Sequence, residues 1–428
     1  MLTNLILKTI IRIKKSKLDD FFNILMFILI GLFLIAFFNN PEGPQKNIFF
    51  YKCKNLFGDF FLNLIYTSEK NPYFSTIGGF GEKAYLPLSY LIYYFFVKFD
   101  NFYEMDLAQA TKSDGGILGI VIFSIISIIL LFHSISKLNK NKEFNIIQTV
   151  IILFSSVTLF SIERGNLIII TSAFVIYFLA YYESNSKNER FFSLITLCAA
   201  VVLKGYPVIF GMLLLKKSHY RSIFFCIFFT LIISIIPFFF LKNGINNIPK
   251  FFLNFFANGD QYNYKYFFPR FGLPHLVFCI SKFLRLNNDT IDFLIQFSTY
   301  LMFSIAAFTL YIFFKEKDEW KSIAFLTIIL IQIPKNSALY TGLYFLPVII
   351  LFFKSNKHPS KLNFVYVLLF ILFLNPFQIP FQISTNNNNY QLTINSFVSN
   401  ISILILWASL LITSINKKNE KLSNHTNK

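Results

Sequence analysis

The chain has 428 residues, of which 55% are hydrophobic and only 14% are charged, and its mean hydropathy is +0.57. A soluble domain carries about 25% charged residues, so this composition excludes a soluble enzyme and leaves no room for a soluble catalytic domain. The net charge of +18 lies in short Lys- and Arg-rich stretches beside apolar runs. That is the positive-inside pattern of membrane proteins, and it argues against a nucleic-acid partner.

Apolar runs close to the spanning length of ~20 residues recur along the whole chain. Because a backbone in lipid must satisfy its own hydrogen bonds, each run is expected to be a helix. We therefore predict an all-α polytopic membrane protein, with residues 1–428 forming one domain of about ten to twelve transmembrane helices and with both ends in the cytoplasm. The clearest runs cover residues 21–38, 117–135, 146–160, 167–182, 222–240, 291–314 and 401–415.

The first long polar segment follows the first apolar run. Basic residues at 8–17 place the N-terminus in the cytoplasm, so residues 39–84 form the first extracytoplasmic loop. The spacing of aromatic and aliphatic residues over 47–67 predicts an amphipathic helix lying on the membrane surface. Pro72 and the glycines at 78–81 then end it.

Later in the chain, two segments allow two interpretations each. Residues 191–215 are either one long helix or two half-helices broken at Lys204-Gly205-Tyr206-Pro207, and residues 270–286 are either a span or a re-entrant segment. Residues 242–270 form the second extracytoplasmic loop. Residues 375–396 have few lysines and are also predicted to be extracytoplasmic, and their run Asn386–Asn389 is typical of a mobile loop. Residues 416–428 form a cytoplasmic tail.

Asp59 is the first candidate for chemistry, because a protein with so few carboxylates must perform acid–base chemistry with those it has. It lies in the first extracytoplasmic loop, where a lipid-linked substrate would meet an acceptor. A carboxylate there is placed to act as a general base toward an acceptor hydroxyl.

Four polar clusters interrupt apolar runs, and polar groups at membrane depth are costly enough to be functional candidates. They are Glu163-Arg164-Gly165-Asn166, Lys204-Gly205-Tyr206-Pro207, Pro269-Arg270 with His275, and Pro334-Lys335 with Tyr340 and Tyr344. Each also has a purely structural interpretation, as a tight turn, a snorkelling cation or a capping charge. From their charge and depth we expect Lys204, Arg164 and Arg270 to bind a phosphate.

Other site types are not indicated. None of the four cysteines forms a C-x-x-C pair, and no two histidines have metal-ligand spacing. There is no glycine-rich dinucleotide fingerprint and no P-loop. We therefore expect no metal, no cofactor and no nucleotide.

The ordered motifs resemble glycosyltransferase family 87. These are Gly58-Asp59-Phe60, Asn71-Pro72-Tyr73, Tyr85-Leu86-Pro87-Leu88, Arg164-Gly165-Asn166 and Leu203-Lys204-Gly205-Tyr206-Pro207, and the resemblance covers about residues 20–350. The family consists of GT-C-fold membrane enzymes related to the mycobacterial α-1,2-mannosyltransferases that use polyprenyl-phosphate mannose. Asn71 replaces a family glycine, and the first loop has one Asp in place of the Asp-x-Asp of some GT-C relatives, which argues against a required metal.

The resemblance implies an inverting transfer of a hexose, mannose in the relatives, from a polyprenyl-phosphate donor to a glycolipid or polysaccharide of the cell envelope. The reaction would take place on the extracytoplasmic side of the cytoplasmic (inner) membrane, with Asp59 as the base. We expect the substrates to contact Tyr73, Tyr85, Asn166, Lys335 and Tyr340.

Two other functions remain open from the sequence. A polysaccharide polymerase or ligase of the O-antigen type would depend on Arg270 and would not need Asp59. A flippase or transporter of lipid-linked sugars would need paired broken helices, and only the break at Lys204–Pro207 qualifies.

Overall fold

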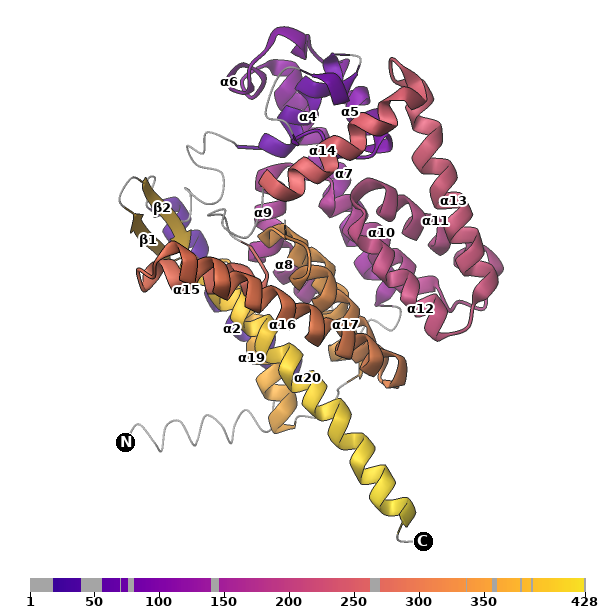
Figure 1. The fold of residues 1–428 in the computed structure, drawn as a ribbon, viewed down its shortest axis with the longest axis vertical. Coiled ribbons are helices and arrows are strands. Elements are labelled where there is room, and N and C mark those ends of the chain that lie inside the picture. Colours follow the sequence, from indigo (N-terminus) through magenta and orange to yellow (C-terminus); the bar gives the residue numbers. More distant parts are fainter. Residues whose placement is uncertain are drawn as a thin grey trace. The chain divides into compact units, whose positions relative to one another are not determined.

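The computed structural model describes residues 18–39, 56–69, 71–75, 81–139, 146–261, 270–335, 337–355, 360–377, 379–385 and 388–426 (Figure 1). The chain divides into two compact units. Unit 1 comprises Met1–Gln45, Asn141–Val157 and Phe267–Lys428, and unit 2 comprises Lys46–Lys140 and Thr158–Tyr266. The prediction that residues 1–428 act as one membrane domain stays a prediction.

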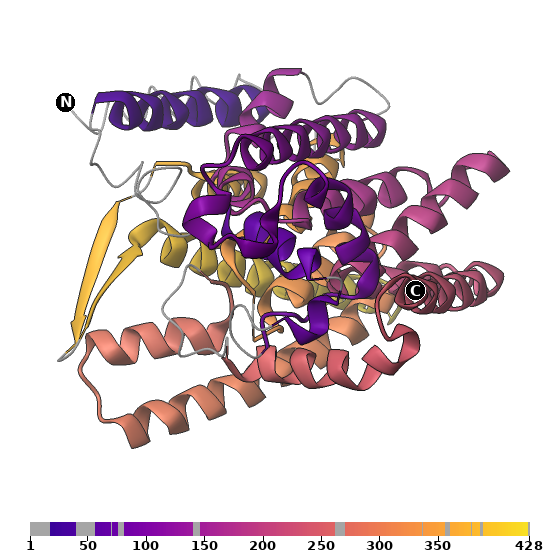
Figure 2. The same cartoon turned by 90° about the horizontal axis from the view of Figure 1, so that it is seen from above.

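Unit 1 is built from helices with one small hairpin. In Figure 2, α15 and α16 run side by side, and the strands β1 and β2 lie near them. Helix α2 packs on α8 and α19, and α20 contacts α15, α16, α17 and α19. The elements are α2 (Leu18–Asn39), α8 (Ile146–Leu153), α15 (Leu273–Phe283), α16 (Asn288–Lys315), α17 (Glu319–Gln332), η6 (Leu339–Phe345), α18 (Leu346–Ser355), α19 (Lys361–Leu374), β1 (Pro380–Thr385), β2 (Asn388–Thr393) and α20 (Ile394–Thr426).

Unit 2 has α7, α10 and α11 packed side by side, with α4 against α5. Its elements are α4 (Gly58–Ser68), η1 (Pro72–Phe74), α5 (Pro87–Val97), η2 (Phe102–Glu104), α6 (Leu107–Ala110), α7 (Asp114–Leu138), α9 (Ser156–Arg164), α10 (Ile168–Tyr181), α11 (Lys187–Lys204), η3 (Tyr206–Phe210), α12 (Gly211–Lys216), α13 (Tyr220–Ile235), η4 (Ile236–Phe240), η5 (Gly244–Asn247) and α14 (Ile248–Gln261). The boundary between the units falls near the start of α9.

The helices confirm an all-α polytopic membrane protein. Within the described residues, five helices are long and apolar enough to cross a membrane, or six if the bent pair α8 and α9 counts as one span. Six further apolar helices have 10–17 residues. Among the described residues, the helices long enough to cross a membrane are therefore fewer than the ten to twelve spans predicted. Breaks at Gly and Pro divide several of the apolar runs into shorter helices.

The structure decides between the two interpretations of residues 191–215. Helix α11 ends at Lys204, Gly205 follows with φ 70°, and the chain continues as the 3-10 helix η3 and then α12. The run is thus broken where Gly205 and Pro207 predicted. In the segment 270–286, α15 has 11 residues and a length of about 16 Å, too short to cross a hydrocarbon core of ~30 Å.

Helix α4 differs from the predicted surface helix. Residues 47–55 lie outside the described residues, and the part from Gly58 onward is buried on nearly all sides. Phe60, Phe61, Leu64 and Ile65 join the core of unit 2 with residues from α5, α7 and α10. The prediction of a helix lying on the membrane surface is therefore wrong for this segment, since its aromatic side chains pack against protein.

The segment 375–396 contains a hairpin, and of the run Asn386–Asn389 that was predicted as a mobile loop, residues 386 and 387 lie outside the described residues while Asn388 and Asn389 belong to β2. Strands β1 and β2 pair antiparallel, with Pro380 opposite Thr393 and Thr385 opposite Asn388. Helix α20 continues to Thr426, into the segment predicted as the cytoplasmic tail, and the cytoplasmic location of that tail stays a prediction.

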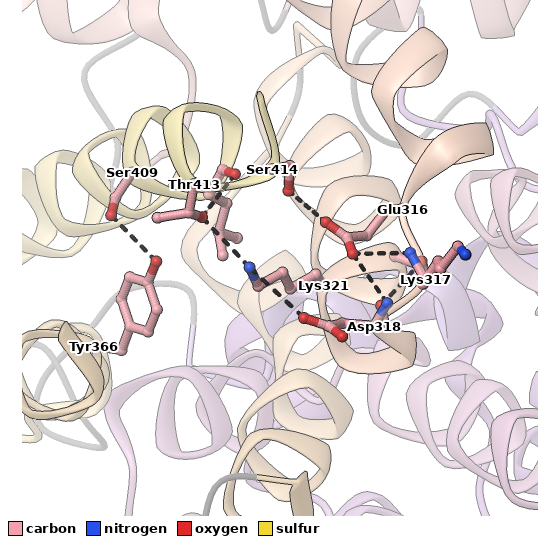
Figure 3. Close-up of polar contacts among 10 residues, drawn as sticks. Glu316, Lys317, Asp318, Lys321, Tyr366, Ser409, Thr413 and Ser414 are labelled. Atoms are coloured by element: carbon pink, nitrogen blue, oxygen red, sulfur yellow. Dashed lines mark hydrogen bonds and ion pairs between the residues drawn. The ribbon is translucent and has the colours of Figure 1, made fainter. Parts of the chain in front are cut away.

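Polar contacts tie the turn between α16 and α17 to α20 in unit 1 (Figure 3). One carboxylate oxygen of Glu316 accepts the backbone N–H groups of Lys317 and Asp318 at 2.8 and 2.9 Å, and the other accepts the Ser414 hydroxyl. The Lys321 ammonium lies 3.7 Å from the Asp318 carboxylate and 3.4 Å from the Thr413 hydroxyl. Glu316 therefore satisfies the backbone of the turn and also fixes the turn to α20.

Candidate active site

The start of α4 brings Asp59 to the end of α9. The backbone N–H of Phe57 donates to the carbonyl of Glu163 at 2.8 Å, and Phe57 takes the left-handed conformation with φ 54° directly before the helix. Asp59 lies in the first turn of α4, where the free backbone N–H groups and the helix dipole favour a negative charge. Its position is thus fixed by backbone pairing between segments about a hundred residues apart.

The two oxygens of the Asp59 carboxylate have different partners. Arg164 Nη2 donates to Oδ1 at 2.6 Å, and Asn166 Nδ2 donates to Oδ2 at 2.5 Å. The Asn166 amide oxygen accepts the backbone N–H of Ile168 at 2.9 Å, at the start of α10. Asn166 therefore cannot turn away without losing two hydrogen bonds, and it holds Asp59 against the N-terminus of α10.

Gly165 allows the turn between Arg164 and Asn166 to come this close. Its φ of +61° lies in the left-handed region, and a β-carbon there would lie 2.7 Å from the Phe60 β-carbon and 3.1 Å from Ile120 Cδ1. Only glycine combines this conformation with that approach. The motif Arg164-Gly165-Asn166 is thus a turn that presents both flanking side chains to one carboxylate.

Lys204 ends α11 and points toward the same region of unit 2. Its ammonium donates to the Tyr85 hydroxyl at 2.7 Å and lies 4.3 Å from the centre of the Tyr85 ring. Its charge acts on Asp59. Because Gly205 caps the helix and Pro207 prevents its continuation, Lys204 stands at a helix end and not in mid-helix.

Tyr73 contacts the backbone of Tyr85. The Tyr73 hydroxyl donates to the Tyr85 carbonyl at 2.8 Å, and its ring packs edge-on against Tyr90 at 5.4 Å between centroids. Only 1% of Tyr73 is exposed. In this arrangement Tyr73 positions Tyr85, and its direct contact with a substrate stays a prediction.

The surroundings keep Asp59 ionised. Partial burial raises the pKa of a carboxyl group, but the charge and hydrogen bond of Arg164, the charge of Lys204 and the hydrogen bond of Asn166 together outweigh it. The pKa of Asp59 therefore lies below its usual value. The Asp59 side chain is 20% exposed and the Arg164 side chain is 14% exposed, so the pair is mostly buried but still accessible to solvent.

Tyr93, which the sequence interpretation missed, belongs to the same region. Its hydroxyl is buried, interacts electrostatically with Asp59, and has no hydrogen-bond partner among the described residues. Tyr93 lies one helical turn after Tyr90 on α5, and this spacing was the only signal of it in the sequence.

The remaining three candidates belong to unit 1. Arg270 is buried, its guanidinium donates to the Lys335 carbonyl at 3.3 Å, and its backbone forms an antiparallel bridge with Ala338. Lys335 is exposed, and Tyr340 is half-buried in η6. The structure thus places Asp59, Arg164, Asn166, Lys204, Tyr85 and Tyr73 in unit 2, and Arg270, Lys335 and Tyr340 belong to unit 1.

The chemistry of the unit 2 cluster is that of an ionised carboxylate beside two cations. In the described part of the chain, no three His, Cys, Asp or Glu side chains come together in a way that would hold a metal ion. The arrangement can accept a proton at Asp59 and can stabilise negative charge near Arg164 and Lys204.

Comparison with known proteins assigns the chain to a family of enzymes. The family model described as "Glycosyltransferase family 87" matches residues 116–333, about half of the chain, and this range includes Arg164, Asn166, Lys204 and Arg270. No curated protein and no solved structure matches the chain. Its apolar helices make the protein a multi-pass membrane protein, and the family match shows that it is a transferase that belongs to glycosyltransferase family 87.

Proposed function

We propose that the protein transfers a hexose from a polyprenyl-phosphate donor to a glycolipid or polysaccharide acceptor, with inversion at the anomeric carbon. The reaction would take place on the extracytoplasmic side of the cytoplasmic membrane. The observation that carries this proposal is the Asp59 carboxylate, which accepts hydrogen bonds from Arg164 at 2.6 Å and from Asn166 at 2.5 Å, with the Lys204 charge acting on it. Membership in the family supports a sugar donor and an acceptor as the substrates.

Asp59 is the proton acceptor in this proposal. The acceptor hydroxyl oxygen forms a bond to the anomeric carbon on the face opposite the phosphate, while the bond between that carbon and the phosphate oxygen breaks. The bonding electron pair leaves with the phosphate, and the hydroxyl proton passes to Asp59. An ionised carboxylate offers about four lone-pair positions, and the two hydrogen bonds from Arg164 and Asn166 occupy only one on each oxygen.

The low pKa of Asp59 suits a late proton transfer. A hydroxyl group becomes strongly acidic once its oxygen has begun to bond to a cationic sugar carbon. A weak base therefore suffices, and it is present in its ionised form at every physiological pH.

Arg164 and Lys204 would stabilise the departing phosphate. Arg164 and Lys204 are the two cations that act on Asp59, and they would bind a singly charged phosphodiester there, while the buried Glu163 carboxyl group also interacts with Arg164 and Asp59. Lys204 donates to the uncharged Tyr85 hydroxyl at 2.7 Å, a contact that does not neutralise it, and although burial lowers the pKa of Lys204 to about 8 the ammonium form still prevails at pH 7. Charges that are fixed in place before the reaction stabilise a developing anion more effectively than water does.

The direct test replaces Asp59 by Asn, which has nearly the same shape but is not a base. The purified Asp59→Asn variant in lipid vesicles should transfer no sugar from any of a panel of polyprenyl-phosphate sugars, while its thermal unfolding stays cooperative. Full activity of this variant with a donor that the natural protein uses would remove Asp59 from the mechanism. Inversion is checked separately, from the anomeric configuration of the product.

A further inference from the structure

Helix α14 presents large apolar side chains to its surroundings, where a surface helix of a soluble protein presents polar ones. Its outward residues Phe252, Leu253, Phe255 and Phe256 are 50–65% exposed. They recur at the spacing of one helix face. The inward residues Asn254 and Phe251 are 1% and 8% exposed.

The inward face of α14 is fixed by specific contacts within unit 2. Asn254 Nδ2 donates to the Tyr73 carbonyl at 3.4 Å, Asn258 Nδ2 donates to the Gly81 carbonyl at 2.8 Å, and the Phe251 ring meets the Tyr73 ring edge-on at 6.0 Å. Just before the helix, Asn247 accepts from Asn71 at 2.9 Å. The outward orientation of the aromatic face is thus set by four specific contacts.

The aromatic face follows, along the chain, a candidate membrane span whose apolar side chains are also exposed. Residues Tyr220–Phe240 form one of the five candidate spans, and only 11% of its apolar 18-residue stretch is buried. Its last residues, Phe239 and Phe240, are 64% and 73% exposed, and α14 begins eight residues later at Ile248. Figure 1 shows α14 turning away from the axis of α13 at this point.

Helix α14 cannot itself be a span. It has 14 residues and a length of about 21 Å, below the ~30 Å of a hydrocarbon core, and it carries Asn254, Asn258 and Asp260. A helix with one apolar aromatic face and one polar face, directly after a span, has the properties of a helix lying in the membrane–water boundary.

We propose that α14 lies along the membrane surface, with the acyl chains of the lipid leaflet covering Phe252, Leu253, Phe255 and Phe256. Embedded there, α14 braces Tyr73 through Asn254 and Phe251, and Tyr73 in turn holds the carbonyl of Tyr85, the residue that binds Lys204. The lipid leaflet thereby helps to position the Lys204 side of the cluster. The membrane contact itself does not depend on which donor the enzyme uses.

Spin labels on α14 test the proposal in lipid vesicles. In the full-length protein with its four native cysteines replaced by alanine, single cysteines at 252, 253, 254, 256 and 258 carry a nitroxide. Phe228→Cys in the middle of α13 serves as the lipid control, and Ala108→Cys on α6 serves as the aqueous control; both positions are exposed. Collision rates with oxygen and with a water-soluble nickel chelate then report the depth of each label.

The expected result is oxygen contact at positions 252, 253 and 256, and protection from both reagents at 254 and 258. Labels at 252 and 256 should lie at equal depth, whereas a helix that entered the membrane steeply would separate them by about 6 Å. Accessibility of 256 to the nickel chelate, as at 108, would overturn the proposal. Protection of 256 from both reagents would overturn it as well, since protein would then cover that face.

A second measurement leaves the cysteines in place. Phe256→Trp should be quenched by lipids brominated near the headgroup end of the acyl chain, like a tryptophan near the end of α13, and Ala108→Trp should not. Equal quenching of the two tryptophans by a water-soluble quencher would contradict the lipid contact even if the cysteine-free protein failed to fold.

Discussion

A β-carbon on Gly165 would lie 2.7 Å from the β-carbon of Phe60, a separation that real side chains do not reach. The turn that carries Arg164 and Asn166 therefore meets the start of α4 only because residue 165 has no side chain. Phe60 follows Asp59 directly, so this close approach also sets the distance between the carboxylate and its two partners.

Gly165→Ala should therefore damage both stability and activity. The left-handed φ costs about 1 kcal/mol for alanine, and the overlap with Phe60 adds about 1–3 kcal/mol or moves the turn. Gly205→Ala is the matched control, because Gly205 also has a left-handed φ, of +70°, but has no atom within 4 Å of the added carbon. Thermal unfolding in detergent should show a clearly larger loss for position 165. Equal losses at the two positions would mean that the approach to Phe60 is not tight.

Arg164→Lys should lower activity more than it lowers stability. Lysine keeps the charge beside Asp59 but cannot bind two oxygens in one plane, as the guanidinium group does. If Arg164 also stabilises the departing phosphate, kcat should fall by about 10²–10³-fold, the effect of losing one fixed donor to a developing anion. Single-turnover rates at saturating donor measure this. An unchanged kcat would restrict Arg164 to holding Asp59.

The lowered pKa of Asp59 predicts a stability difference that depends on pH. A carboxyl group whose pKa is lower in the folded protein stabilises the fold fully above its unfolded value of about 3.9, and this contribution is lost as the pH falls through the lower folded value. The difference in melting temperature between the natural protein and Asp59→Asn should be constant from pH 7 to about pH 5 and should shrink below about pH 4. A difference that shrank already between pH 7 and pH 5 would contradict a lowered pKa.

Lys204→Met and Tyr85→Phe separate the charge of Lys204 from its position. The methionine variant removes the ammonium, so transfer should fall by at least about 10²-fold if the charge stabilises the phosphate. Tyr85→Phe keeps the ring under the ammonium and removes only the hydroxyl that accepts from it at 2.7 Å, so the loss should be smaller, about 10-fold or less. Initial rates over a range of donor concentrations measure both. Tyr85→Phe as severe as Lys204→Met would show that the hydroxyl contacts the substrate.

Arg270→Ala distinguishes the proposed transfer from a reaction of the polymerase or ligase type. Asp59→Ala should abolish transfer if Asp59 is the base. Arg270→Ala should retain measurable transfer, because the buried Arg270 guanidinium donates to the Lys335 carbonyl in unit 1 and so has a structural role there. Thermal unfolding of both variants serves as the folding control. An inactive but folded Arg270→Ala together with an active Asp59→Ala would support a polymerase or ligase.

The local chemistry of the chain predicted the membrane class, the break after Lys204 and most of the residues of the unit 2 cluster. Hydropathy, a glycine at a helix end and a proline that cannot continue a helix are properties of neighbouring residues. They act before any tertiary contact forms, and sequence inspection finds them for that reason. The family resemblance that these motifs carried is confirmed by the match over residues 116–333.

One sequence interpretation failed because tertiary packing changed the meaning of a pattern. Residues of α4 and of α14 both show aromatic side chains at helical spacing, and only the first segment was predicted to lie at the membrane surface. The structure buries Phe60 and Phe61 of α4 in the core and leaves Phe252 and Phe256 of α14 exposed. A periodic apolar face shows that a helix has a preferred side, but not whether protein or lipid covers it.

The sequence by itself determined that the protein is a helical membrane protein. An apolar run in lipid can form its backbone hydrogen bonds within the segment only as a helix. Only the tertiary structure decided which cations face Asp59. Arg164 is 105 residues away in the chain, and Lys204 is placed by its bond to Tyr85, 119 residues away. Such pairings depend on how α4, α5, α9 and α11 pack, which no local pattern encodes.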